Sequence, residues 1–124
     1  MTVESSFPII TTPDLERALA FYRDVLGGRV VYAFPPEGPP AFVSMDLGSS
    51  HLGFGHDPAV DLDAAQRIAL WVYTDDCDGL VESVRASCGA AAVVEEPTDQ
   101  PWGERVARVV DPDGNRVIVG QASS

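Results

Sequence analysis

The sequence lacks the long hydrophobic runs of membrane and exported proteins. No apolar stretch in its 124 residues approaches the ~20 residues that a transmembrane helix needs. The amino terminus, MTVESSFPII, also lacks the basic start and apolar core of a signal peptide. We therefore expect a cytoplasmic protein without a membrane partner.

Cysteine is also scarce. Cys77 and Cys88 fall on one predicted helix, and their spacing at about 1.5 Å of rise per residue separates them by roughly 16 Å, too far for a disulfide. Neither belongs to a CxxC pair or has a histidine nearby. The pattern predicts reduced thiols and no cysteine metal site.

Basic residues are few. The chain has 8 Lys plus Arg against 19 Asp plus Glu, and a net charge of -11. Such a field repels nucleic acid and anionic lipid and favours cationic small molecules. An acidic surface also serves solubility alone, so the charge excludes partners more firmly than it selects one. No Ser-His-Asp arrangement or phosphate-binding loop is present either.

The first half of the chain predicts a strand, a helix and three further strands. The strand covers residues 7–12, Thr12 is the predicted helix cap, and Gly27 and Gly28 end the helix. Apolar residues recur between them at helical spacing: Leu15, Ala18, Leu19, Tyr22, Val25 and Leu26. Segments 29–34, 41–47 and 50–55 then predict an antiparallel meander.

The second half repeats this order. A strand at 67–74 precedes a helix at 79–89 and strands at 90–96, 104–110 and 116–120, and the DPDG sequence before the last strand predicts a tight turn. A shift of 62 residues, from 14 to 76 and from 27 to 89, superposes Asp14 on Asp76 and Gly27 on Gly89. We infer an internal duplication.

These elements predict an α+β fold. Residues 1–124 form a single domain of two βαβββ modules, 1–57 and 66–121, joined by a linker at 58–65. A helix covers one face of each sheet, and we expect the opposite faces to curl into a concave groove. Strand alternation sends Leu52, Phe54 and the 117 and 119 valines to the helix side.

Three segments resemble the vicinal oxygen chelate superfamily, which includes glyoxalase, extradiol dioxygenases, and fosfomycin and bleomycin resistance proteins. They are PDLERALAFYRDVLGG, DDCDGLVESVRASCGA and PWGERVARVVDPDGNRVIVGQ. The resemblance spans essentially the whole chain. It implies two βαβββ modules per chain and a homodimer, often with modules of two chains building each cavity.

Enzymes of that superfamily hold a divalent metal at four positions, one in the first and one in the last strand of each module. The motifs align these positions with Phe7, Gly53, Arg67 and Ile118. Three of these residues have no donor atom, and a guanidinium stays protonated and repels a cation. We therefore predict no metal, no cofactor and no catalytic residue, and expect a binding protein rather than an enzyme.

Loss of the metal ligands is what bleomycin-binding resistance proteins of the superfamily show, and Trp102-Gly103 before the DPDG turn is a further shared feature. The resemblance implies metal-independent sequestration of a small cationic or aromatic molecule, of the bleomycin-type antibiotic resistance kind. The alternative is a divergent metal-dependent lyase or dioxygenase that uses His51 and Glu104. A third possibility is metabolite binding for regulation or delivery.

The predicted ligand-binding residues face the groove or its rim: Phe7, Ile9, Phe34, Phe42, His51, Arg67, Trp71, Tyr73, Trp102, Glu104 and Ile118. The aromatic side chains are expected to stack on planar or cationic rings, and the alternative for some of them is a dimer interface. Asp46, Asp99 and Glu104 are candidate partners of a cation or ordinary surface charges. Arg67 and Arg116 pair either with ligand carboxylates or across the dimer.

Overall fold

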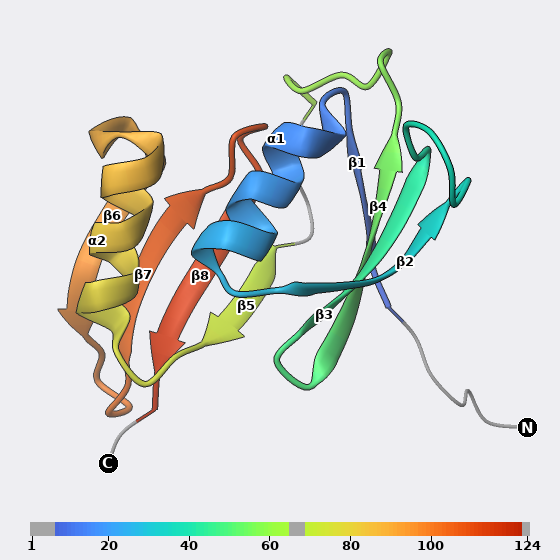
Figure 1. The fold of residues 1–124 in the computed structure, drawn as a ribbon. Helices are drawn as coiled ribbons and strands as arrows, with labels where there is room; N and C mark the ends of the chain where they lie inside the picture. Colours follow the sequence, from blue (N-terminus) through green and yellow to red (C-terminus); the bar gives the residue numbers. More distant parts are fainter. Residues whose placement is uncertain (1–6, 65–68, 123–124) are drawn as a thin grey trace, which may run out of the picture. The chain divides into compact units, whose positions relative to one another are not determined.

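Two four-stranded sheets form the framework of the protein (Figure 1). The computed structural model describes residues 7–64 and 69–122. Backbone contacts divide the chain into two compact units, Met1–Asp61 and Leu62–Ser124. Each unit combines one sheet with one main helix, so the predicted α+β class with two βαβββ modules is confirmed. The predicted groove and homodimer stay predictions.

In the first unit, strand β1 (Ile9–Thr12) leads to helix α1 (Leu15–Leu19), which continues as a π-helix over Ala20–Val25. Strands β2 (Arg29–Phe34), β3 (Phe42–Leu47) and β4 (Ser50–His56) follow. The sheet order is β1-β4-β3-β2. The three later strands form the predicted antiparallel meander, and β1 runs parallel to β4.

The second unit has the same order. It contains β5 (Leu70–Tyr73), α2 (Cys77–Cys88), a 3-10 turn (Ala90–Ala92), β6 (Val93–Asp99), β7 (Arg105–Val110) and β8 (Arg116–Gln121). The sheet order β5-β8-β7-β6 repeats that of the first unit, again with a parallel pair between the first and last strands. Helix α2 packs on β6, β7 and β8 (Figure 1).

Strand alternation was predicted correctly for the core. Leu52 and Phe54 are buried, and the ring of Phe54 lies 5.0 Å from that of Tyr22 on the helix. In the second unit Val117 and Val119 are fully buried. Each such side chain contributes about 1.5–3 kcal/mol when it leaves water. The opposite face of each sheet is therefore the one that carries the remaining side chains of these strands.

The two helices begin in the same way, which supports the duplication. The hydroxyl oxygen of Thr12 accepts from the backbone N–H of Asp14 at 3.1 Å, and that of Thr74 accepts from Asp76 at 3.2 Å. The helix caps are Asp14 and Asp76, which accept from the N–H groups of residues 17 and 79 at 3.1 and 2.9 Å. The prediction of Thr12 as the cap was wrong, because the carboxylate two residues later takes that position.

Two further elements differ from the sequence prediction. The second half of the first helix closes an i→i−5 bond, from Leu26 N–H to the Phe21 carbonyl at 3.1 Å, where an ordinary α-helix was expected. Residues 90–92, predicted as strand, form the 3-10 turn, and β6 instead extends to Asp99. Alanine has little preference for strands, so the sequence pattern placed the start of this strand at residue 90, whereas it lies at Val93.

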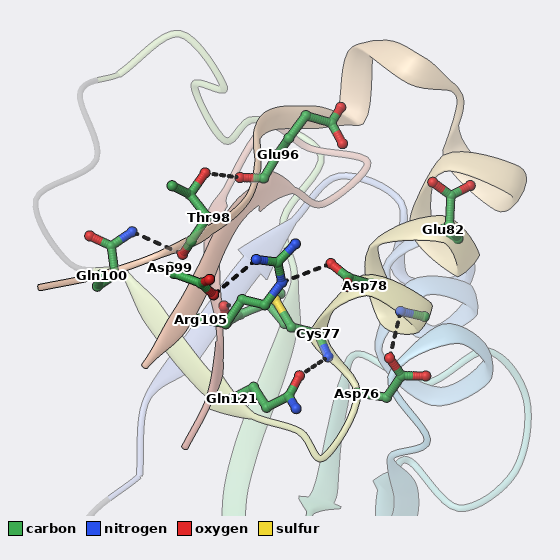
Figure 2. A network of polar contacts seen from close by, with 12 residues as sticks. Asp76, Cys77, Asp78, Glu82, Glu96, Thr98, Asp99, Gln100, Arg105 and Gln121 are labelled. Carbon is green, nitrogen blue, oxygen red and sulfur yellow. Dashed lines mark hydrogen bonds and ion pairs between the residues drawn. The ribbon is translucent and has the colours of Figure 1, made fainter. Parts of the chain in front are cut away.

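A polar network fixes the start of α2 to its sheet (Figure 2). Arg105 on β7 pairs with Asp78 of α2 at 3.1 Å and with Asp99 at 2.9 Å. The Gln121 side-chain oxygen accepts from the backbone N–H of Cys77 at 2.8 Å. Asp99, a candidate partner for a cationic ligand, is thus held beside the helix.

The two thiols differ in exposure. Cys77 is buried and lies 3.6 Å from the Val119 carbonyl, and burial raises its pKa, whereas Cys88 is exposed. Both are free, as predicted from their spacing. Within residues 7–64 and 69–122, no helix is long and apolar enough to cross a membrane.

Candidate functional site

The open face of each sheet, defined here as the face opposite its main helix, carries the predicted binding residues that the structure describes. On the second sheet, Trp71 pairs in register with Ile118, and Tyr73 with Gly120. Several aromatic side chains remain accessible, with 39% of Trp71, 63% of Tyr73 and 62% of Trp102 exposed. Accessible aromatic residues beside a sheet are suited to stacking on a planar ligand.

Glu104 gathers two of these aromatic residues. The Tyr73 hydroxyl donates to Glu104 Oε2 at 2.8 Å, and the Trp102 indole N–H donates to Oε1 at 2.7 Å. The bond to the carboxylate raises the pKa of Tyr73, and burial adds to the shift. Tyr73 therefore remains protonated and keeps donating at neutral pH. We call Trp71, Tyr73, Trp102 and Glu104 the aromatic–acid cluster.

A short turn sets the direction of Glu104. The Gln100 N–H donates to the Glu104 carbonyl at 2.7 Å, and the Gly103 N–H donates to Gln100 at 3.0 Å. Gly103 has a φ of 102°, a conformation that favours glycine. The turn thus brings Trp102 and Glu104 close enough to hydrogen bond across two residues.

Trp71 lies against the backbone of β8 at Gly120. A Cβ atom built on Gly120 would lie 2.8 Å from the indole Nε1 and 3.0 Å from Cζ2. The rings of Trp71 and Tyr73 are 5.8 Å apart with an interplanar angle of 53°. The glycine therefore makes room for the indole beside Tyr73 and the rest of the cluster.

The same open face also carries arginines. Arg108 lies in register with Ile118 and pairs with Glu95 at 2.8 Å. Arg116 is exposed at the first residue of β8. Arg67, a predicted binding residue, lies outside the described residues. Because Arg108 pairs with Glu95, it does not compete with Tyr73 and Trp102 for the carboxylate of Glu104.

The first sheet presents a more apolar open face. Phe42 pairs in register with Phe34 and also with Gly55, and its ring lies 6.4 Å from that of Tyr32. A Cβ atom on Gly53 would lie 2.9 Å from Phe42 and 3.1 Å from Ile9. An aromatic ring thus occupies the space beside a glycine in this unit too. Phe7, the other predicted residue here, is half exposed.

A row of ionisable side chains crosses the other end of that face. Asp46 on β3 lies in register with Arg29 on β2 and with His51 on β4. Arg29 reaches the carboxylate at 2.9 Å, and His51 Nδ1 lies 2.5 Å from its other oxygen. The hydrogen bond from Arg29 lowers the pKa of Asp46, and His51 adds to this effect.

The four positions aligned with metal ligands do not fit a metal. Gly53 and Ile118 hold equivalent places, as the partners of Ile9 and Trp71, and neither has a donor atom. Arg67 lies outside the described residues. The shift of 62 residues that superposes Thr12 on Thr74 makes Ala69 the equivalent of Phe7, and Ala69 has only a methyl group. In the described ranges, no three His, Cys, Asp or Glu side chains are placed to hold a metal.

Comparison with known proteins places the chain in a family. Residues 5–119 match the model of the Glyoxalase/Bleomycin resistance protein/Dioxygenase superfamily. The chain belongs to this superfamily. The resemblance predicted from the three sequence segments is therefore confirmed. A search of curated proteins found no relative.

Solved structures show the same fold. TioX from Micromonospora sp. ML1 has a TM-score of 0.73 and 22% identity, over 94% of this chain and 98% of its own. Protein SA1046 from S. aureus has a TM-score of 0.76 and 21% identity, over 98% and 100%. A bleomycin-binding protein solved in complex with bleomycin has a TM-score of 0.68 and 23% identity, over 98% and 100%.

Sequence reasoning named the members of the aromatic–acid cluster but missed how they combine. The hydrogen bonds of Glu104 to Tyr73 and Trp102 follow from the turn before β7, which no strand pattern describes. Gly120 was also missed as a site residue. Gly120 lies on the same face as Trp71, at a strand position where most residues would carry a side chain. The missing side chain is the signal that could have identified it.

Proposed function

We propose that the protein binds and sequesters a small cationic or aromatic molecule without a metal. The observation that carries this proposal is the aromatic–acid cluster on the open face of the second sheet. Trp71 and Tyr73 offer ring faces, and Glu104 offers a negative charge oriented by two hydrogen bonds. Aromatic faces and a carboxylate together attract a cationic ring.

Three further observations support the proposal. The positions at which metal enzymes of the superfamily hold their ligands have no donor atoms in the described chain, and at Gly53 the space is occupied by the ring of Phe42. A solved structure with the same fold holds bleomycin. The net charge of -11 raises the local concentration of cationic molecules.

Titration of tryptophan fluorescence tests the proposal. Both tryptophans of the chain, Trp71 and Trp102, belong to the cluster. We expect saturable quenching by at least one member of a panel of cationic, ring-containing natural products that includes bleomycin, unchanged by a chelator. Trp71→Ala should weaken binding at least tenfold, because an aromatic stacking contact is lost.

A matched control is Tyr32→Ala, which removes an exposed ring from the first sheet that is not among the predicted binding residues. It should leave the titration unchanged. Quenching that the chelator abolishes, or that Trp71→Ala leaves intact, would contradict the proposal.

A divergent enzyme is the second candidate, and His51 favours it. Its Nδ1 faces Asp46, which leaves Nε2 of this exposed ring available as a proton acceptor. Such an enzyme would turn over a compound that the protein binds. We expect no turnover in the panel; turnover that His51→Gln abolishes would establish the second candidate instead.

A further inference from the structure

The hydrogen bonds of Glu104 define which ligand groups the cluster accepts. A carboxylate has about four lone-pair positions, while a tyrosine and a tryptophan each have one polar proton to donate. Tyr73 and Trp102 donate these protons to the two different oxygens of the Glu104 carboxylate. Each oxygen keeps acceptor capacity, and neither aromatic residue has a proton left to give a ligand.

No arginine in the described part of the chain pairs with Glu104. Three arginines of the second unit have other carboxylate partners: Arg85 pairs with Glu82 and Glu96, Arg105 with Asp78 and Asp99, and Arg108 with Glu95. The charge of Glu104 is thus stabilised by two neutral donors. Among the residues that the structure describes it has no cationic partner, so a ligand cation could take that place.

A planar cation with two parallel N–H groups matches this arrangement. Guanidinium and amidinium groups present a rigid fork whose spacing fits the two oxygens of a carboxylate. Trp71, which packs on Gly120, supplies a ring face beside Tyr73, whose hydroxyl donates to the acid. An aromatic ring that bears an amidinium can donate to Glu104 and stack at the same time.

We propose that the aromatic–acid cluster selects planar cations that carry N–H donors over quaternary cations and over anions. This inference rests on the proposed function and names the ligand class of the same site. A quaternary cation is attracted by the charge but leaves the remaining acceptors of Glu104 unused. An anion meets a carboxylate and finds no donor on Trp102 or Tyr73.

Two flat dyes test the inference on the 124-residue chain. DAPI is a flat diamidine with N–H donors and two positive charges, and thioflavin T is a flat single cation without N–H donors, so benzamidine and phenyltrimethylammonium, with one charge each, supply the charge-matched comparison. We expect DAPI to bind at least about tenfold more tightly in a fluorescence titration, the factor of a charge-assisted hydrogen bond. Benzamidine should displace DAPI, whereas phenyltrimethylammonium and benzoate at equal concentration should not.

Glu104→Gln assigns the preference to this residue. The amide keeps the size of the side chain but loses the charge and one acceptor oxygen. DAPI affinity should fall about tenfold or more, and thioflavin T affinity should change much less. Glu95→Gln is the matched control, since Glu95 already pairs with Arg108 on the same sheet, and it should alter neither titration.

Tyr73→Phe provides a second route if Glu104→Gln does not fold. It keeps the ring but removes one of the two donors that orient Glu104, and should weaken DAPI more than thioflavin T. Equal affinities of the two dyes, or equal losses in the variants, would overturn the selectivity while stacking survives. Absence of binding by both dyes and by the natural-product panel would overturn the proposed function as well.

Discussion

The open faces of the two sheets differ far more than the scaffolds that carry them. Both units begin their helix with a Thr-x-Asp turn that makes the same hydrogen bonds, and both place a parallel first strand beside the last one. The first open face carries phenylalanines and the row of Arg29, Asp46 and His51. The second carries the aromatic–acid cluster, whose carboxylate has no cationic partner among the described residues, and the ion pair of Arg108 with Glu95.

This difference indicates where the duplicated halves are free to diverge. Caps and buried valines or leucines determine whether a unit folds, because each contributes on the order of 1 kcal/mol or more. Side chains on the open face contribute less to folding and more to what the face binds. In both units, however, an aromatic ring occupies the space beside a glycine, Phe42 at Gly53 and Trp71 at Gly120.

The largest effects on binding and stability are expected from adding a methyl group at each of these glycines. In Gly120→Ala the new Cβ meets the indole of Trp71, so the ring must move. We expect DAPI binding to fall about tenfold and stability to fall by about 1–3 kcal/mol, the usual cost of overpacking. Near-UV circular dichroism should report the displaced tryptophan.

Gly53→Ala is the counterpart in the first unit, where Phe42 must move instead. Its loss of stability should be similar, and its DAPI binding should match that of the unchanged protein. If Gly53→Ala weakened binding as much as Gly120→Ala, the ligand would contact the first open face as well.

Much of the fold could be predicted because its signals are local. Alternation placed Phe54 and Val119 inside because β-strands have a period of two. The cap of the first helix was missed because Thr12 and Asp14 are both good N-caps. Residues only two positions apart can be distinguished as caps only when the backbone conformation is known. After the π-helix the chain passes close to it, and the Gly28 N–H donates to the Tyr22 carbonyl at 2.9 Å, a contact that no helical pattern describes.

The candidate site could be predicted only as separate residues. Strand parity placed Trp71 and Tyr73 on the open face, and the Trp-Gly pair marked Trp102. The contact of Tyr73 with Glu104 joins residues 31 positions apart and depends on the turn at Gly103. A sequence pattern reports which face a strand residue occupies, but it does not report how a loop side chain reaches across it.

A smaller effect is expected at the caps, which should make the two units look alike. Asp14→Ala and Asp76→Ala each remove the acceptor for one backbone N–H. Each should lower the free energy of unfolding by about 1 kcal/mol, as measured by urea denaturation. Asparagine at either position retains the acceptor and should cost much less. A large loss in one unit and none in the other would show that the equivalent caps carry unequal loads.

The smallest effect concerns acid stability and sharpens the comparison of the charged groups. Arg29 lowers the pKa of Asp46 in the first unit, and Arg85 lowers that of Glu96 in the second. A carboxyl whose folded pKa is depressed stabilises the protein above its unfolded pKa, and this contribution is lost as pH falls through the folded value. Asp46→Asn and Glu96→Gln should therefore each be slightly less stable than the unchanged protein near neutrality.

Both differences should begin to shrink as pH falls through the ordinary carboxyl range of about 3.9 to 4.3, and should vanish below the depressed folded pKa values. Unfolding in urea, followed by circular dichroism from neutral pH to below this range, measures the convergence. High salt should reduce the neutral-pH differences, because the pairs are solvent-accessible and screened. A stability gap that persisted unchanged at low pH would mean that these side chains act by packing and not by charge. The row Arg29–Asp46–His51 would then not differ from the aromatic–acid cluster by a stabilising charge interaction.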